Sequence, residues 1–152
     1  MHLNARTDYA LRAVVELAAA GGTAAGPVTA ERLATAQGIP PKFLESILLQ
    51  LRRAGIINAQ RGPEGGYWLA RPAAEISLAD VIRVIDGPLA NVRGQRPEQV
   101  GYQGAAVALQ EVWIALRASE RAILELVTVA DVVAAELPEP VRTLVSDPRA
   151  WV

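Results

Sequence analysis

The chain has 152 residues, about the length of a single domain, and half of its residues are hydrophobic while a fifth are charged. This composition supports a packed core and argues against a disordered chain. The chain contains no cysteine and one histidine, His2. Disulfides, thiolate-bound metals, iron–sulfur clusters and Cys-His catalysis are therefore excluded. We expect a soluble cytoplasmic protein, because no uncharged run is long enough to cross a bilayer and charges interrupt any N-terminal signal sequence.

The net charge of −1 hides an uneven distribution. Residues 1–72 carry eight basic and five acidic side chains, a net charge of +3, whereas residues 73–152 carry seven and eleven, a net charge of −4. A basic half joined to an acidic half favours contact between the first half and a polyanion.

Apolar residues at three- and four-residue spacing predict a helix that runs from Thr7 to Gly21. Thr29 can cap a short second helix. Pro41 can open a third, which ends at Ala54–Gly55, because a proline at the first helical position loses no hydrogen bond.

The spacing of four residues favours a helix-turn-helix. The motif needs a small residue where two helices cross, a glycine in the turn, and apolar residues that hold the second helix against the first. Ala34, Gly38, Leu44 and Ile47 meet these requirements in that order. Two short strands, 56–60 and 67–70, follow and flank the glycine-rich hairpin loop 61–66. The order helix, helix, hairpin predicts a winged helix.

The second half is predicted to be helical around one long loop. Ser77 can begin a helix that ends at Asp86, and no periodic pattern is present in 87–103. A long helix is expected over 104–127, and Thr128 can cap a short helix that ends at Glu136. We therefore divide the chain into a DNA-binding domain (1–86), a loop (87–103), dimerisation helices (104–136) and a C-terminal tail (137–152).

Three stretches resemble a family of bacterial winged-helix regulators, which includes iron–sulfur-cluster regulators, nitric-oxide-sensing repressors and cysteine-metabolism repressors. They are 38–45 (GIPPKFLE), 51–55 (LRRAG) and 61–72 (RGPEGGYWLARP). Two further segments, 7–12 near the start of the chain and 76–87, are also similar to the family. The resemblance covers about residues 1–135. It implies a dimeric transcription factor that binds a partly palindromic operator.

The second helix of the motif carries the candidate DNA contacts. Lys42 can meet a phosphate or a guanine edge, or it can be a solvated lysine. Glu45 can accept a hydrogen bond from a cytosine amino group, as similar proteins do from this position, or can pair with Lys42. Phe43 and Ser46 are also candidates on this helix, although Phe43 can instead pack against the hairpin. Gln50 and Arg53 are expected to be phosphate contacts or solvated surface and not base readers.

Arg61, at the tip of the hairpin, suits the negative potential of a narrow A·T-rich minor groove. Gly62, Gly65 and Gly66 would let the backbone approach the phosphates closely. Thr29 can place the start of its helix against a phosphate, although capping alone would explain it. Arg6 and Arg12 resemble contacts to the DNA backbone from the first helix.

The expected long helix presents a heptad-like apolar stripe. About 24 residues would give a length of roughly 36 Å, more than one small winged-helix domain can cover. An antiparallel helix from a second copy would bury the stripe, or the stripe can pack against the first helix of the same chain. The predicted interface residues are Leu109, Val112, Trp113, Leu116, Ile123 and Leu126.

The loop 87–103 lies where many members of the resembled family place three cysteines that bind the cluster, and it contains none. Cluster-based sensing is therefore not expected, and no cofactor is predicted. Asp8 is expected to cap a helix or to form a salt bridge with a basic side chain. A small ligand, a protein partner or no effector remain open. Arg93, Arg96, Tyr102 and Trp113 can form a pocket, or the loop can be a plain connection.

The sequence thus predicts a mainly α-helical protein with a β-hairpin wing and a long dimerisation helix. The expected function is a homodimeric transcriptional repressor that binds double-stranded DNA. The alternative is a winged-helix protein–protein adaptor that has lost DNA binding, which the pI near 5.9 favours. An enzyme is not expected, because the sequence contains no phosphate loop, metal set or credible nucleophile–base pair.

Overall fold

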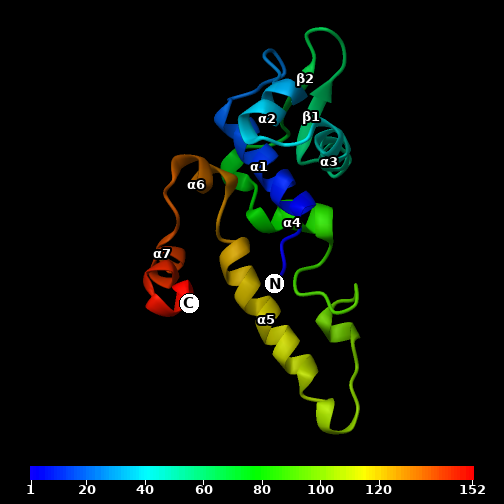
Figure 1. Ribbon diagram of the computed structural model, residues 1–152, viewed down its shortest axis with the longest axis vertical. Helices are drawn as coiled ribbons and strands as arrows, with labels where there is room; N and C mark the ends of the chain where they lie inside the picture. The colour runs from blue at the N-terminus through cyan, green and yellow to red at the C-terminus, as the bar shows by residue number, and fades with distance from the viewer.

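The computed structural model describes residues 1–152 as a helical body that carries a hairpin at one end and a projecting helix at the other (Figure 1). The body is built from the first four helices and the hairpin. The elements are α1 Ala5–Ala19, α2 Ala30–Gln37, α3 Pro41–Arg53, β1 Ile57–Gln60, β2 Gly66–Leu69 and α4 Leu78–Asp86. The remaining helices are α5 Leu109–Leu124, α6 Val129–Ala134 and α7 Glu139–Ser146.

Helix starts and stops follow the capping chemistry of the sequence. Thr29 Oγ1 accepts the Arg32 backbone N–H at 3.2 Å at the start of α2, and Gly38 ends this helix in the left-handed region at φ +62°. Ser77 and Thr128 each form a reciprocal capping box, with Asp80 and Asp131 respectively. These predicted caps are confirmed.

One hydrophobic core holds the first half together. It lies where α1, α2 and α3 meet, and it includes the helix-turn-helix residues Ala34, Leu44 and Ile47, which are all buried. The hairpin strands pair antiparallel, with Ile57 opposite Leu69. The predicted winged helix-turn-helix is therefore confirmed.

A third segment is attached to the wing. The backbone N–H of Val28 donates to Tyr67 O at 2.9 Å, and the Tyr67 N–H donates back to Val28 O at 2.8 Å. A Cβ built on Gly66 would lie 2.5 Å from Val28 O, so only glycine fits this approach. The wing is thus fixed to the segment that leads into α2.

The predicted long helix is shorter than expected. Instead of running over 104–127, α5 has 16 residues, about 24 Å, and a separate 3-10 turn, Gly104–Ala106, precedes it. Gly104, the predicted first residue of the long helix, has a φ of +59° and therefore lies outside right-handed helical geometry. Beyond Leu124 the backbone forms a turn over 125–126 and becomes extended at Thr128, and Val127 O accepts the Leu78 backbone N–H at 3.0 Å.

The segment predicted as a tail, 137–152, contains α7 and the 3-10 turn Pro148–Trp151. The preceding helix, α6, ends at Ala134, before the predicted end at Glu136, because Ala135 adopts the left-handed region at φ +55°. Pro138 stands immediately before α7, and Pro140 lies in its first turn. A proline that breaks one helix can begin the next, because its fixed φ suits the first turn. Figure 1 shows α7 beside α5 with the two helices separated.

No helix of the protein is long and apolar enough to cross a membrane.

Candidate nucleic-acid interface

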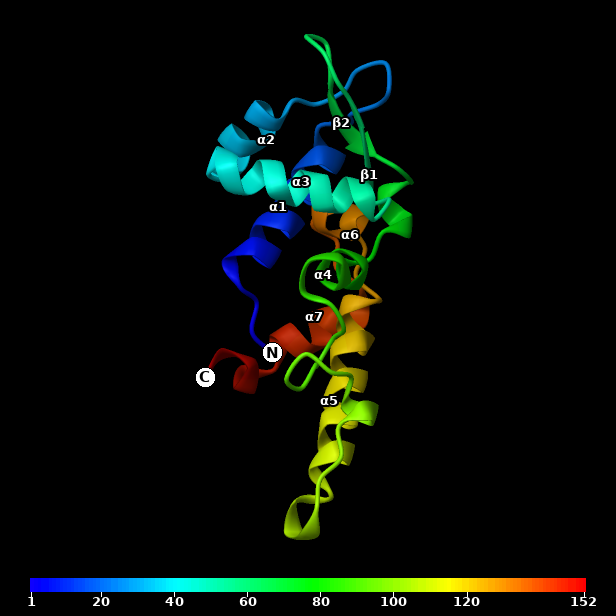
Figure 2. The same ribbon diagram turned by 90° about the vertical axis from the view of Figure 1, so that its right-hand side faces the viewer.

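The helical spacing of α3 determines which of its residues face outward; we call this outward side its exposed arc. Leu44, Ile47, Leu48 and Leu51 bury one side of the helix against the core, and the residues between them face outward. At 100° per residue, Lys42 and Arg53 lie near the middle of the outward arc. Figure 2 shows α3 lying across the face of the molecule that is turned to the viewer, below the wing.

One edge of this arc faces the wing. Glu45, Leu49 and Arg52 line a surface hollow of about 670 Å³ together with residues at the start of α2 and in the hairpin. The hollow also brings in Thr29, Arg61, Gly62, Gly65 and Gly66. Six of the predicted site residues, from three separate elements, therefore line one concave surface.

Arg52 was not among the predicted site residues, although it lines this hollow. The spacing Glu45, Leu49, Arg52 is i, i+4, i+7, so these three side chains share one side of α3. That spacing could have identified Arg52, whereas Arg53 lies one position further around the helix.

The other edge of the arc faces α1. Arg6 Nη1 donates to Ser46 Oγ at 2.8 Å, and Arg6 Nη2 donates to Gln50 Oε1 at 2.9 Å. Gln50 Nε2 donates in turn to the Val84 carbonyl of α4 at 2.8 Å. The Phe43 ring lies 6.2 Å from the Tyr9 ring of α1 and not against the hairpin, and its side chain is half exposed.

Ser46, Gln50 and Phe43 therefore lie away from the wing hollow, and the Gln50 amide is occupied by contacts within the protein. Lys42 and Arg53 are exposed, and Lys42 forms no ion pair with Glu45. Asp8 pairs with Arg12 at 3.0 Å, which is one of the two roles expected for it.

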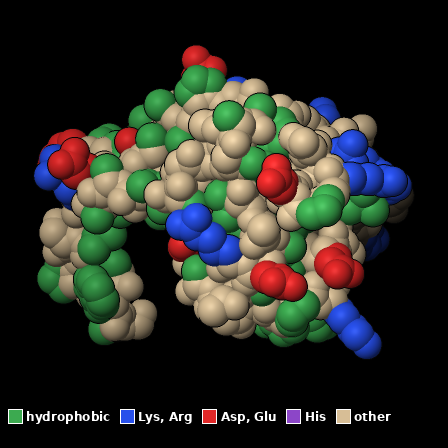
Figure 3. All heavy atoms as spheres, turned by 90° about the horizontal axis from the view of Figure 1, so that it is seen from above, with side chains coloured by type: hydrophobic (Ala, Val, Ile, Leu, Met, Phe, Trp, Pro, Cys, Tyr) green, Lys and Arg blue, Asp and Glu red, His purple; other side chains and the backbone are tan.

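The charge distribution matches this geometry. Figure 3 views the molecule from the wing end, and basic side chains gather at the right-hand edge, the side on which α3 lies in Figure 1. Acidic and other basic side chains are scattered over the rest of that view, and the hollow itself is lined by Glu31 and Glu45 as well as Arg52 and Arg61. Oppositely charged DNA phosphates would be attracted to the α3 side.

Comparison with known proteins decides the family. The family model Rrf2, described as "Iron-dependent Transcriptional regulator", matches residues 3–135. The chain belongs to the Rrf2 family. It is a DNA-binding transcriptional regulator of the helix-turn-helix type and not an enzyme.

Rrf2 relatives match almost the entire chain. A Mycobacterium tuberculosis H37Rv protein, Rv1287, named as a candidate HTH-type transcriptional regulator, is 52% identical over 99% of this chain and 92% of its own length. The structure of CymR, "the Global Cysteine Regulator of B. subtilis", matches with a TM-score of 0.73 at 27% identity, over 89% of this chain and 98% of CymR. The T. potens IscR structure matches with a TM-score of 0.69 at 27% identity, over 89% and 88%.

The iron in the Rrf2 description requires ligands that this chain does not supply. Iron–sulfur clusters are held mainly by cysteine thiolates, and the sequence contains no cysteine. No group of three His, Cys, Asp or Glu side chains is placed to hold a metal ion. The residues present therefore do not fit an iron–sulfur cluster.

The residues suspected of forming a loop pocket are divided between two hollows. Arg93, Tyr102 and Trp113 line one, where Trp113 Nε1 donates to the Tyr102 hydroxyl at 3.0 Å. Arg96 lines another hollow, on the α4 side of the loop.

Proposed function

We propose that this protein is a cytoplasmic transcriptional repressor that binds a partly palindromic operator as a homodimer. The observation that carries the proposal is the hollow shared by the start of α2, the middle of α3 and the wing. A helix in the major groove and a wing beside it contact both base edges and the sugar–phosphate backbone.

Six residues of the hollow have a chemical role in this proposal. Glu45 accepts a hydrogen bond from a cytosine amino group, and Arg61 enters the adjacent minor groove. Arg52 and Thr29 lie at the rim of the same hollow and contact phosphates, Thr29 together with the first backbone N–H groups of α2. Gly62 and Gly65 leave room for the DNA backbone.

The homodimer is supported by the exposed apolar face of α5. Leu109, Val112 and Leu116 are each at least 40% exposed, and Trp113 and Ile123 are partly buried beside them. Leu126 lies beyond the end of α5 and is also 42% exposed. A large apolar surface of this kind is typical of a protein–protein interface, and α5 from a second copy fits it by two-fold symmetry.

Operator selection followed by quantitative binding tests this function. Genomic fragments retained by the purified protein would give the operator, and its affinity would then be measured over a salt series. Binding through several phosphates predicts that log K falls steeply with log salt. Absence of duplex binding at low salt would favour the protein–protein adaptor instead.

Two substitutions separate the contacts. Glu45→Ala is expected to change base preference at one operator position by about 1–3 kcal/mol. Arg61→Ala is expected to weaken binding and to relax the preference for an A·T-rich flank. Equal affinities of the wild type and both variants on the selected operator would refute these assignments.

A further inference from the structure

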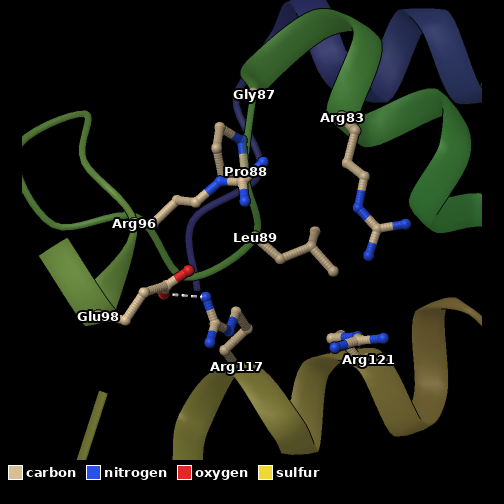
Figure 4. A pocket seen from close by; sticks show the side chains of 8 residues that line it. All are labelled: Arg83, Gly87, Pro88, Leu89, Arg96, Glu98, Arg117 and Arg121. Carbon is tan, nitrogen blue, oxygen red and sulfur yellow. Dashed lines mark hydrogen bonds and ion pairs between the residues drawn. The ribbon is translucent and has the colours of Figure 1, made fainter. Parts of the chain in front are cut away.

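Four arginines converge on one hollow on the opposite side of α4 from α3. Arg83 comes from α4, Arg96 from the loop that follows α4, and Arg117 and Arg121 from successive turns of α5 (Figure 4). The hollow has a volume of about 460 Å³, which is within the usual size of small-molecule sites, roughly 300–1,000 Å³. Its lining is otherwise short, consisting of Gly87, Pro88, Leu89 and Glu98.

The positive charge of the hollow is only partly balanced. Glu98 is bonded to Arg117, and Glu125, which lies outside the lining, is bonded to both Arg83 and Arg121. Two carboxylates therefore pair with three of the four guanidinium groups, and the cluster keeps an excess of two positive charges. The Arg96 guanidinium forms no hydrogen bond or ion pair, although Figure 4 shows it directed toward the same space.

Glu98 and Glu125 are both ionised at neutral pH, so the excess positive charge of the cluster is two. Hydrogen bonds from Arg83 and then Arg121 hold the pKa of Glu125 below its ordinary value. A hydrogen bond from its own backbone amide, and then one from Arg117, lower the pKa of Glu98.

Without a bound anion, two of the four arginines repel each other. Arg117 and Arg121 are four residues apart on one helix, where like charges repel. The ion pairs that offset this repulsion are partly exposed to water, and such pairs stabilise a protein by little. A ligand can therefore replace or share these arginine contacts at small cost.

We propose that Arg83, Arg96, Arg117 and Arg121 form a binding site for a small oxyanion that carries two or more negative charges. Guanidinium groups bind carboxylate and phosphate oxygens through paired N–H donors, which suits a dicarboxylate or a phosphorylated metabolite. No aromatic ring lines the hollow, so the site offers no surface on which a nucleobase could stack. The ligand is compact and strongly charged.

Titration calorimetry at constant ionic strength tests the site on the full-length protein without DNA. Inorganic pyrophosphate and succinate serve as the two probes, with sodium chloride as the blank. The proposal predicts that at least one of them binds once per protomer, and the comparison shows whether phosphate or carboxylate is preferred. Heats equal to the chloride blank with both probes would overturn it.

Three single substitutions make the test specific. Arg96→Gln should weaken binding about tenfold or more, since it removes a charged donor that no other group in the protein holds. Arg93→Gln, on the same loop but outside this hollow, should change the affinity less than about twofold. Equal losses in these two variants would indicate a non-specific charge effect and refute the site.

Glu98→Gln predicts the opposite sign. It removes a carboxylate that competes for Arg117, so the bound probe should be held several-fold more tightly than by the wild type. A damaged fold would weaken binding in every variant. Tighter binding in Glu98→Gln beside weaker binding in Arg96→Gln therefore identifies the hollow itself, and unchanged or weaker binding in Glu98→Gln counts against it.

Discussion

Individual side chains on α3 divide between contact with the protein and exposure to solvent. Ser46 and Gln50 accept hydrogen bonds from Arg6, whereas Lys42 and Arg53 remain exposed. Periodicity in the sequence separated the buried from the outward residues correctly. It could not show that Arg6, forty positions earlier, would approach Ser46, because that contact depends on how α1 crosses α3.

Gln50→Ala should lower the free energy of unfolding by about 1–2 kcal/mol, because it removes one of the two acceptors of the Arg6 guanidinium and the side-chain donor to the partly buried Val84 carbonyl. Denaturant unfolding at fixed protein concentration measures the change. Arg53→Ala is the control on the same helix, and it should have almost no effect on stability since Arg53 is exposed. Equal stabilities for the two variants would contradict the role assigned to Gln50.

At the scale of elements, the position of the wing depends on close approach between its backbone at Gly66 and Tyr67 and the backbone of Val28. Its two strands were predicted from two short runs, 56–60 and 67–70, on either side of the glycine-rich loop. The pairing of Val28 with Tyr67 was not predicted, because a single bridge between distant segments has no periodic pattern.

Gly66→Ala should therefore detach the wing from the segment before α2. The added Cβ would lie 2.5 Å from Val28 O and 3.1 Å from Pro27 Cβ, so the backbone must move. We expect a loss of about 2 kcal/mol in stability, measured by denaturant unfolding. Gly101→Ala, where no neighbouring atom lies within 4 Å and φ is not positive, should be close to neutral.

The helices of the second half show what sequence patterns leave undetermined. The caps at Ser77 and Thr128 were predicted because capping is local. The ends of α5 were placed too far out on both sides, because the apolar stripe continues through Leu126 while the backbone has already left the helix. Extended pairing between Ser77 and Thr128, a tertiary contact, competes with helix continuation there.

At the scale of the whole molecule, α5 projects from the body and leaves much of its apolar face uncovered in a single protomer (Figure 1). Its apolar side chains would cost free energy in water unless another surface buries them. The proposed second copy supplies that surface.

Val112→Glu should convert the proposed dimer to a monomer. Val112 is 53% exposed, so a glutamate there is tolerated by the free protomer but would be buried at the interface. Sedimentation should then give the protomer mass of 16.2 kDa in place of twice that value. Ala118→Glu, an exposed position on the other side of α5, should leave the mass unchanged, and a monomeric wild type would refute the dimer.

The Gln50 amide links three helices, since it accepts from Arg6 of α1 and donates to the Val84 carbonyl of α4. Val84 directly follows Arg83 in the chain, so α3 and the guanidinium cluster hold adjacent residues of one short helix. A ligand that moved the Arg83 side chain would therefore act one residue away from the carbonyl that bonds α4 to α3.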